Sequence, residues 1–274
     1  MKLVIMGSGT SNGIPALGCD CPVCASKDPK DKRSRASLYI EGHSGETAVI
    51  DTGPEFRIQA LAAGIQKLDA VFITHAHADH MHGLDDVRPL SWENPIPVYC
   101  NTAAIKELRE RFSYVFTSSQ HGGGKPRIIP TEVFGPIKIG SLTFTSIPLK
   151  HGCLDIIGWR IDEITECKNK IKINTAVYLT DVNSIPATSM PLIGNPKILI
   201  IDGLRKRPHV THFSFEESLN KALEIKAKNI YLTHICHDNS HREIMEYCGN
   251  FINQRGISGI TMEPAWDGLV LRLD

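Results

Sequence analysis

The chain has 274 residues, of which 42% are hydrophobic and 22% charged, a balance that allows a folded core and excludes disorder of the whole chain. Its 30 basic and 30 acidic residues give a formal net charge of zero, which argues against a broad nucleic-acid-binding surface. The longest apolar runs, such as Ile198–Ile201, contain only four residues and cannot cross a bilayer.

Short β-branched and aromatic runs recur between Gly, Pro, Asn and Asp residues, a pattern typical of strands. After a first strand within residues 1–9, the predicted strands are Ser37–Glu41, Ala48–Asp51, Ala70–Thr74, Pro97–Cys100, Leu142–Ile147, Ile156–Ile161, Thr175–Thr180, Lys197–Asp202, Asn229–Thr233 and Leu269–Leu273. Apolar residues at helical spacing predict helices over Glu55–Ala63, Thr102–Arg111 and Phe215–Lys226. Ser214 and Glu217 form a predicted cap for the last of these. We therefore expect an α/β or α+β sandwich, in one domain covering residues 1–274.

Three of the eight cysteines, Cys19, Cys21 and Cys24, lie within six residues of a loop rich in Gly, Asp and Pro. One turn can direct three thiolates at a common point, so this spacing predicts a structural zinc site in a loop at about residues 18–26. A fourth ligand must come from elsewhere in the chain. The opening residues are too short for the apolar part of a signal peptide, so we expect free thiols and a cytoplasmic location.

Four predicted strands end at residues that can bind a metal, namely His75, His151, Asp181 and His234. If these strands share a sheet, the four side chains converge on one edge. The first of them opens the segment His-Ala-His-Ala-Asp-His, which ends at His80. In an extended segment His75 and His77 point to the same side and can bind one ion, and a turn would bring Asp79 and His80 to a second. Imidazoles with carboxylates suit zinc, manganese or iron.

With this His-x-His-x-Asp-His segment at a strand end, the sequence resembles the metallo-β-lactamase superfamily. Within that superfamily it is similar to the PhnP-like cyclic-phosphate phosphodiesterases in four features, which are Gly7–Pro15, the cysteine triplet, Asp51–Arg57 and Gly83–Pro89. The resemblance covers most of the chain. It implies an α/β fold arranged as an αββα sandwich, with two divalent ions, zinc or manganese, at one edge.

The family pattern also implies a role for individual residues. The first ion would be bound by His75, His77 and His151, the second by Asp79, His80 and His234, and Asp181 would bridge the two. His237, three residues beyond the last of these ligands, would complete the cysteine triplet, and Cys236 is a chemically reasonable substitute. His212 matches the catalytic histidine that is not a ligand, 22 residues before His234, and His209 is the nearest alternative.

The resemblance implies hydrolysis of a small anionic phosphodiester, such as phosphoribosyl 1,2-cyclic phosphate or a 2′,3′-cyclic nucleotide. A hydroxide that bridges the ions would attack phosphorus, and Asp79 would orient it. His212 would protonate the leaving oxygen or hydrogen-bond to it. We expect no membrane or nucleic-acid partner, and the chain could pair as a homodimer.

Two alternatives remain open. A tRNA 3′-processing endonuclease of the same superfamily shares the dinuclear core but carries an extended basic arm, which this sequence does not contain. A non-catalytic metal-binding protein resembling the pyrroloquinoline-quinone accessory proteins shares much of the N-terminal pattern but would have an incomplete ligand set.

Three further features could assist the site: the carboxylates of Asp51, Asp85 and Asp86 behind ligand imidazoles, a lid at Gly122–Lys125, and phosphate contacts from Arg205–Arg207.

Overall fold

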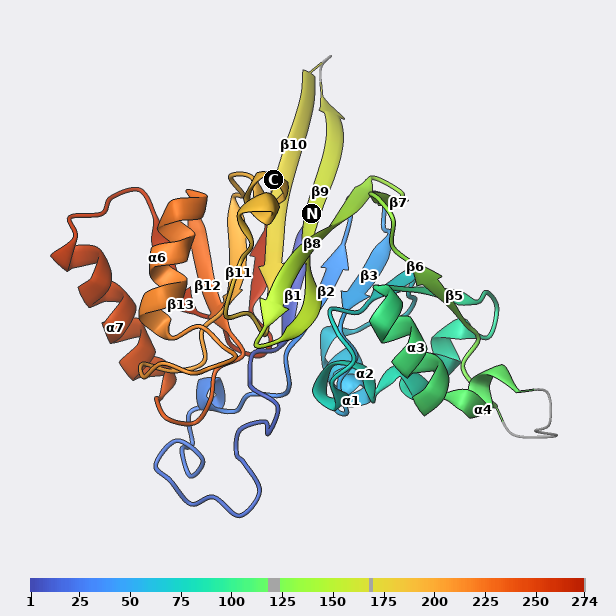
Figure 1. Ribbon diagram of the computed structural model, residues 1–274, viewed down its shortest axis with the longest axis horizontal. Helices are drawn as coiled ribbons and strands as arrows, with labels where there is room; N and C mark the ends of the chain where they lie inside the picture. Colours follow the sequence, from blue (N-terminus) through green and yellow to red (C-terminus); the bar gives the residue numbers. More distant parts are fainter. Residues whose placement is uncertain (118–123, 168–169, 274) are drawn as a thin grey trace.

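The computed structural model describes residues 1–117, 124–167 and 170–273. Two seven-stranded sheets face each other at its centre, and helices cover their outer sides (Figure 1). This is the four-layer αββα sandwich that the sequence predicts. The first sheet has the order β14 (Val270–Arg272), β1 (Lys2–Gly7), β2 (Ser37–Glu41), β3 (Thr47–Ile50), β4 (Ala70–Phe72), β5 (Ile96–Cys100) and β6 (Ile128–Glu132). The second has the order β13 (Thr261–Pro264), β12 (Asn229–Thr233), β11 (Ile198–Asp202), β10 (Lys170–Leu179), β9 (Leu154–Cys167), β8 (Leu142–His151) and β7 (Ile137–Ile139).

The helices among the described residues are 4 to 14 residues long. In chain order they are α1 (Phe56–Ala63), α2 (Ala78–Met81), α3 (Thr102–Arg111), α4 (Ser113–Phe116), α5 (Met190–Ile193), α6 (Phe215–Ile225) and α7 (His241–Gln254). The described residues also form three 3₁₀ helices, namely η1 (Pro29–Asp31), η2 (Leu84–Ser91) and η3 (Ala187–Ser189). Among the described residues, none of these helices combines the length and the apolar character that crossing a membrane would require.

Alternation of side chains along each strand explains the layers. In β1, Leu3 and Ile5 pack between the two sheets, whereas Val4 and Met6 pack on the opposite face, in the cluster that contains helix α1. Aromatic rings fill the space between the sheets, where Phe72 of the first sheet stacks on Phe144 of the second with 3.9 Å between ring centroids. Each sheet is therefore buried on both faces, which fixes the register of its central strands.

Helices α6 and α7 cover the outer face of the second sheet. Both begin with a capping box, formed by Ser214 and Glu217 in α6 and by Ser240 and Glu243 in α7. The predicted cap of α6 is thus confirmed, whereas α7 was not predicted.

The strand ends that carry metal-capable residues lie at the same edge of the sandwich. In Figure 1 this edge is at the bottom, beside the N-terminal loop, and the long hairpin of β9 and β10 projects at the opposite end. Residues 122 and 123 of the possible lid at Gly122–Lys125 lie outside the described residues.

Candidate metal centre

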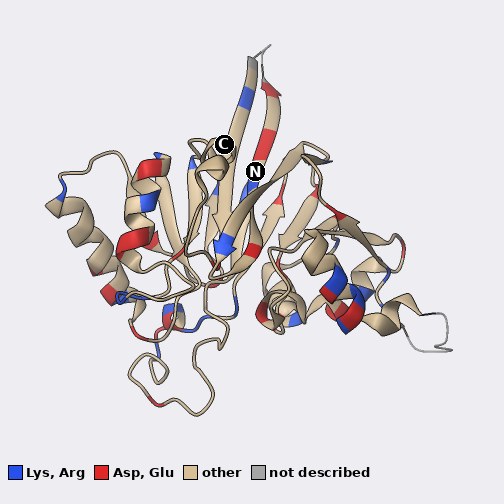
Figure 2. Cartoon of the chain, viewed as in Figure 1, with Lys and Arg blue, Asp and Glu red and all other residues tan. Residues whose placement is uncertain are grey.

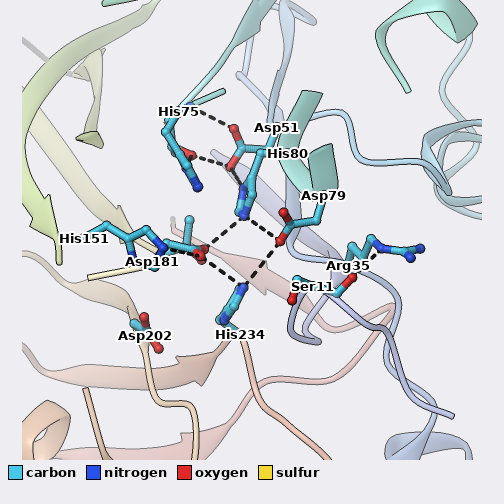
Figure 3. Close-up of polar contacts among 12 residues, drawn as sticks. Ser11, Arg35, Asp51, His75, Asp79, His80, His151, Asp181, Asp202 and His234 are labelled. Atoms are coloured by element: carbon cyan, nitrogen blue, oxygen red, sulfur yellow. Dashed lines mark hydrogen bonds and ion pairs between the residues drawn. The ribbon is translucent and has the colours of Figure 1, made fainter. Parts of the chain in front are cut away.

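Backbone strain marks three of the strand ends at this edge. Asp51 follows β3, Asp181 follows β10 and His234 follows β12, and their φ angles are 63°, 55° and 56°. Residues other than glycine rarely adopt this left-handed region, and each case costs about 1–3 kcal/mol. Such strain persists only where the surrounding structure imposes it and is most common at functional sites. All three side chains lie in the group of polar residues at the sheet edge (Figure 3).

A first cluster consists of His75, His77 and His151, whose candidate ligand atoms lie within 4.8 Å of one another. His151 donates from Nδ1 to the carbonyl of Thr211 at 2.8 Å, so its Nε2 is left as the free nitrogen. The buried Nε2 of His75 has no hydrogen-bond partner among the described residues. A buried ring nitrogen without a hydrogen-bond partner is energetically costly unless it binds a ligand, so these three imidazoles fit a divalent ion.

A second cluster consists of Asp79, His80, Asp181 and His234, all buried. Nε2 of His80 lies 3.1 Å from Oδ2 of both Asp79 and Asp181, and Nε2 of His234 lies 3.2 Å from Oδ1 of Asp181. Neither of these two nitrogens makes a hydrogen bond to the described residues. Ligand atoms that share a tetrahedral ion with bonds of 2.0–2.1 Å are about 3.3 Å apart, so the second cluster also fits a metal.

Asp181 connects the two clusters. Its Oδ2 faces His80, and its Oδ1 faces His234 at 3.2 Å and Nε2 of His151, a member of the first cluster, at 4.0 Å. The arrangement is that of a carboxylate between two neighbouring cation sites. Every residue that the sequence assigned to the two catalytic ions is therefore brought to one place, in the predicted grouping.

The pKa values of Asp79 and Asp181, in the second cluster, are shifted in the opposite direction from that of Asp51, which lies behind His80. Burial alone would raise the pKa values of Asp79 and Asp181, but the neighbouring imidazoles hold both well below their usual range. Burial raises the pKa of Asp51 above its ordinary value despite its contact with His80. The first two carboxylates are thus ionised, as metal ligands must be.

Asp51 orients His80 from behind. Its Oδ2 accepts a hydrogen bond from Nδ1 of His80 at 2.7 Å, and its Oδ1 accepts one from the backbone N–H of Thr74 at 2.8 Å. The loops that carry these residues touch so closely that a Cβ on Gly83 would lie 1.9 Å from the carbonyl oxygen of Gly53. Asp85, by contrast, accepts a hydrogen bond from Tyr114 and takes no part in this contact.

Asp202 plays the same part for His212, a role that was not predicted from the sequence. Oδ2 of this buried carboxylate accepts a hydrogen bond from Nδ1 of His212 at 2.7 Å, which leaves Nε2 of the ring free. The ring of His212 lies 4.7 Å from those of both His151 and His234. The ring of His209 lies 5.2 Å from that of His212, and His209 belongs to none of the candidate ligand groups among the described residues, so the geometry favours His212 over its alternative. Asp202 could have been found, because it too ends a hydrophobic strand, β11.

A third cluster lies in the N-terminal loop. Nδ1 of His237 is 3.3 Å from the sulfurs of Cys19 and Cys24 and 3.6 Å from that of Cys21. A tetrahedral zinc ion with three thiolates and one imidazole requires about 3.6 Å between sulfur and nitrogen, so the four residues fit that ion. The sulfur of Cys236 instead accepts a hydrogen bond from the backbone N–H of Asp238 at 3.4 Å. The geometry therefore favours His237.

Comparison with known proteins places this geometry in a family. The model of the β-lactamase superfamily domain matches residues 47–235. The crystal structure of a diphosphatase from the PhnP family is 37% identical, with a TM-score of 0.82 over 100% of this chain and 98% of that one. The structure of Zn²⁺-bound PqqB from Methylobacterium extorquens has a TM-score of 0.77 over the full length of both chains, but at 18% identity it shows the fold alone.

An octanoyltransferase of Porphyromonas gingivalis is 36% identical over 250 residues, which make up 90% of this chain and 48% of that protein. The chain thus spans about half the length of this curated relative. The matches to the superfamily model and to the diphosphatase cover most or all of the chain. The chain belongs to the metallo-β-lactamase superfamily and, within it, to the PhnP family.

Proposed function

We propose that this protein is a dinuclear metal-dependent hydrolase that cleaves small phosphodiesters, cyclic phosphates among them. The observation that carries the proposal is the sharing of Asp181 between two ligand clusters. A pair of divalent ions in these clusters, zinc or manganese, would supply a nucleophile near neutral pH and offset the charge on phosphoryl oxygens. The diphosphatase in the same family also acts on phosphoryl groups, which supports this substrate class.

His212 and Asp202 provide the proton transfer that ester cleavage requires. Burial and the neighbouring His234 lower the pKa of His212 to about 4, so the ring is neutral at pH 7. Its free Nε2 can take a proton from the attacking water and return it to the leaving oxygen. Asp202 holds the ring in the correct tautomer and stabilises the charged form in between, as the carboxylate of a catalytic triad does.

The alternatives fit the site less well. A non-catalytic metal binder would tolerate gaps in the ligand set, yet each proposed ligand position is filled here. A tRNA-processing enzyme needs a continuous basic surface, whereas α3 carries both acidic and basic residues and α6 carries three glutamates and one lysine (Figure 2). A structural zinc ion on the third cluster would complete the proposed metal content.

The proposal is tested with metal-loaded protein, bis(p-nitrophenyl) phosphate and 2′,3′-cyclic nucleotides. We expect His212→Ala to lower kcat about 10²–10⁴-fold with its metals retained, and Asp181→Ala to lose catalytic metal as well. His43→Ala, a change of an exposed histidine away from the site, serves as the matched control and should behave like the wild type. A fully metallated wild type that hydrolyses none of these diesters would reject the proposal in favour of a metal-binding protein.

A further inference from the structure

A cavity of about 470 Å³ lies between helix α3 and the start of strand β9, and its wall includes His75 and His77 of the first cluster. Cavities of roughly 300–1,000 Å³ are typical of small-molecule sites. Because two candidate metal ligands form part of the wall, a molecule held at the first cluster would extend into this space. The cavity is therefore placed to bind the part of a substrate that the clusters do not hold.

The polar side chains at the β9 side of this cavity already have partners in the protein. Oδ1 of Asn101 accepts a hydrogen bond from the backbone N–H of Ala104 at 2.8 Å, and its amide nitrogen donates to the carbonyl of Asp155 at 3.3 Å. The carboxylate of Asp155 lies 2.6 Å from Nζ of Lys150. The polar groups on this side are thus directed at one another and not at the interior of the cavity.

The same holds for the polar side chains that α3 contributes. Arg111 donates to the carboxylate of Glu107 at 2.9 Å and to the carbonyl of Ala76 at 2.6 Å. These contacts pair the charge of Glu107 and occupy the carbonyl between His75 and His77. Lys106 is exposed at the rim, where its methylene stem adds apolar surface while its ammonium group stays in water.

The remaining wall of the cavity is apolar. Leu154 and Ile156 line it from β9, and Ala103 and Ala104 line it from α3. Ile156 and Ala104 are buried, whereas the side chain of Leu154 is 45% exposed. The two small alanines leave space opposite the branched side chains. A group that fills this space gains free energy in proportion to the apolar area that it covers, so the cavity suits an apolar ligand group.

The position of His212 determines which part of a substrate reaches this cavity. A proton donor must lie within hydrogen-bond reach of the leaving oxygen, and His212 does not line the cavity. The ring of His151 is 5.3 Å from that of His77 and 4.7 Å from that of His212. Asp202, which holds His212, lies at the opposite end of the site from His75 (Figure 3). The leaving group therefore lies beside His212, and the group that stays on phosphorus extends past His75 and His77.

We propose that this cavity is a specificity pocket for an apolar organic group that stays esterified to phosphorus, so that the preferred phosphodiesters carry such a group. The inference rests on the proposed function and names its substrate class. Water adds its oxygen to phosphorus, the bond from phosphorus to the leaving oxygen breaks, and the leaving oxygen takes the proton that His212 received from the water. The ester bond to the group in the cavity stays intact, and Leu154 and Ala103 contact that group.

Two esters with the same leaving group test the pocket. Methyl p-nitrophenyl phosphate and phenyl p-nitrophenyl phosphate both release p-nitrophenol and carry the same charge. They differ only in the group that stays on phosphorus. We expect the wild type to favour the phenyl ester about 10–100-fold in kcat/KM, which is the effect of burying an aromatic ring.

Two variants alter the pocket in opposite ways. Ala103→Leu fills the cavity from the exposed side of α3, and Leu154→Ser removes part of its apolar wall. The ratio of the phenyl to the methyl kcat/KM should fall about 10-fold in the first variant and about 3–10-fold in the second, with little change for the methyl ester. Leu61→Ser is the matched control, because it changes an exposed leucine on α1 outside the cavity, and it should keep the wild-type ratio.

A binding measurement separates this inference from the proposed function. Calorimetry on metal-loaded protein compares phenylphosphonate with methylphosphonate, which have the same phosphonate group. The wild type should bind phenylphosphonate about 10–100-fold more tightly, and this ratio should fall in Ala103→Leu and Leu154→Ser while zinc is retained on the cysteines.

Equal affinities of the wild type for the two phosphonates, or the wild-type ratio in both variants, would overturn the pocket, even if both esters are cleaved. A wild type that cleaves neither ester would reject the proposed function. The calorimetric ratio would still decide whether the cavity binds an apolar group.

Discussion

Replacing Asp51 with asparagine removes one hydrogen-bond acceptor behind a candidate metal ligand without changing the size of the side chain. The amide oxygen can still accept from the N–H of Thr74, as Oδ1 does at 2.8 Å. The amide nitrogen cannot accept from Nδ1 of His80, which now donates to Oδ2 at 2.7 Å. His80 is then no longer held in the tautomer that leaves Nε2 free for an ion.

The expected size of the effect follows from the burial of both partners. Asp51 and His80 are each 0% exposed, so water cannot replace the lost bond. A hydrogen bond that involves a charged group contributes about 1.5–3 kcal/mol, and loss of a carboxylate behind a ligand histidine lowers metal affinity about 10–100-fold. We expect a decrease of this size at the cluster of Asp79, His80 and His234, with no change at the cysteine cluster.

Titration of each variant against a chromophoric chelator, with metal analysis of the dialysed protein, measures both sites in one sample. Asp85→Asn is the matched control, because Asp85 bonds to Tyr114 and not to a candidate ligand. Zinc retained on the cysteines would show that Asp51→Asn is folded. Equal affinity of Asp51→Asn and the wild type for the catalytic ions would refute the orienting role of Asp51.

Three further predictions follow from other contacts. Asp202→Asn should lower kcat about 10²–10⁴-fold in steady-state kinetics with catalytic metal retained, and an unchanged kcat would contradict the role given to this carboxylate. Cys21→Ser should lose structural zinc and also lower the catalytic metal content, because one short segment carries both His237 and His234; full catalytic metal in this variant would show that the two sites are independent. Burial lowers the pKa of His241 to about 4, so below pH 6.5 the unfolded chain binds a proton that the native chain does not. Stability in urea should therefore decline by about 3 kcal/mol from this group as the pH falls from 6.5 to 4, and His241→Gln should show a flatter decline.

Much of the site could be predicted because its ligands follow buried strands. A hydrophobic run that ends at His75, His151, Asp181 or His234 is visible in the sequence, and the sheets bring these ends together. What the sequence does not contain is the partner that orients the catalytic histidine. The spacing before His234 favours His212 over His209, three residues away, but the hydrogen bond from His212 to Asp202 depends on how the loop packs.

The elements that were not predicted depend on tertiary contacts. Strand β6 contains Pro130, which argues against a strand, but β6 lies at the edge of its sheet, where a missing N–H is tolerated. Helix α7 contains Gly249 and Cys248, which are weak helix formers, and its stability comes from the apolar face that it buries against the second sheet. Its capping box at Ser240 and Glu243 was nevertheless a usable signal.

Anomalous diffraction from crystals of the metal-loaded protein tests the central claim most directly. We expect two neighbouring metal peaks about 3.5–4 Å apart, one on the imidazoles of the first cluster and one on the second, with Asp181 between them. A single peak at this edge, or two ions that do not share Asp181, would contradict the dinuclear centre and the diester hydrolysis that depends on it.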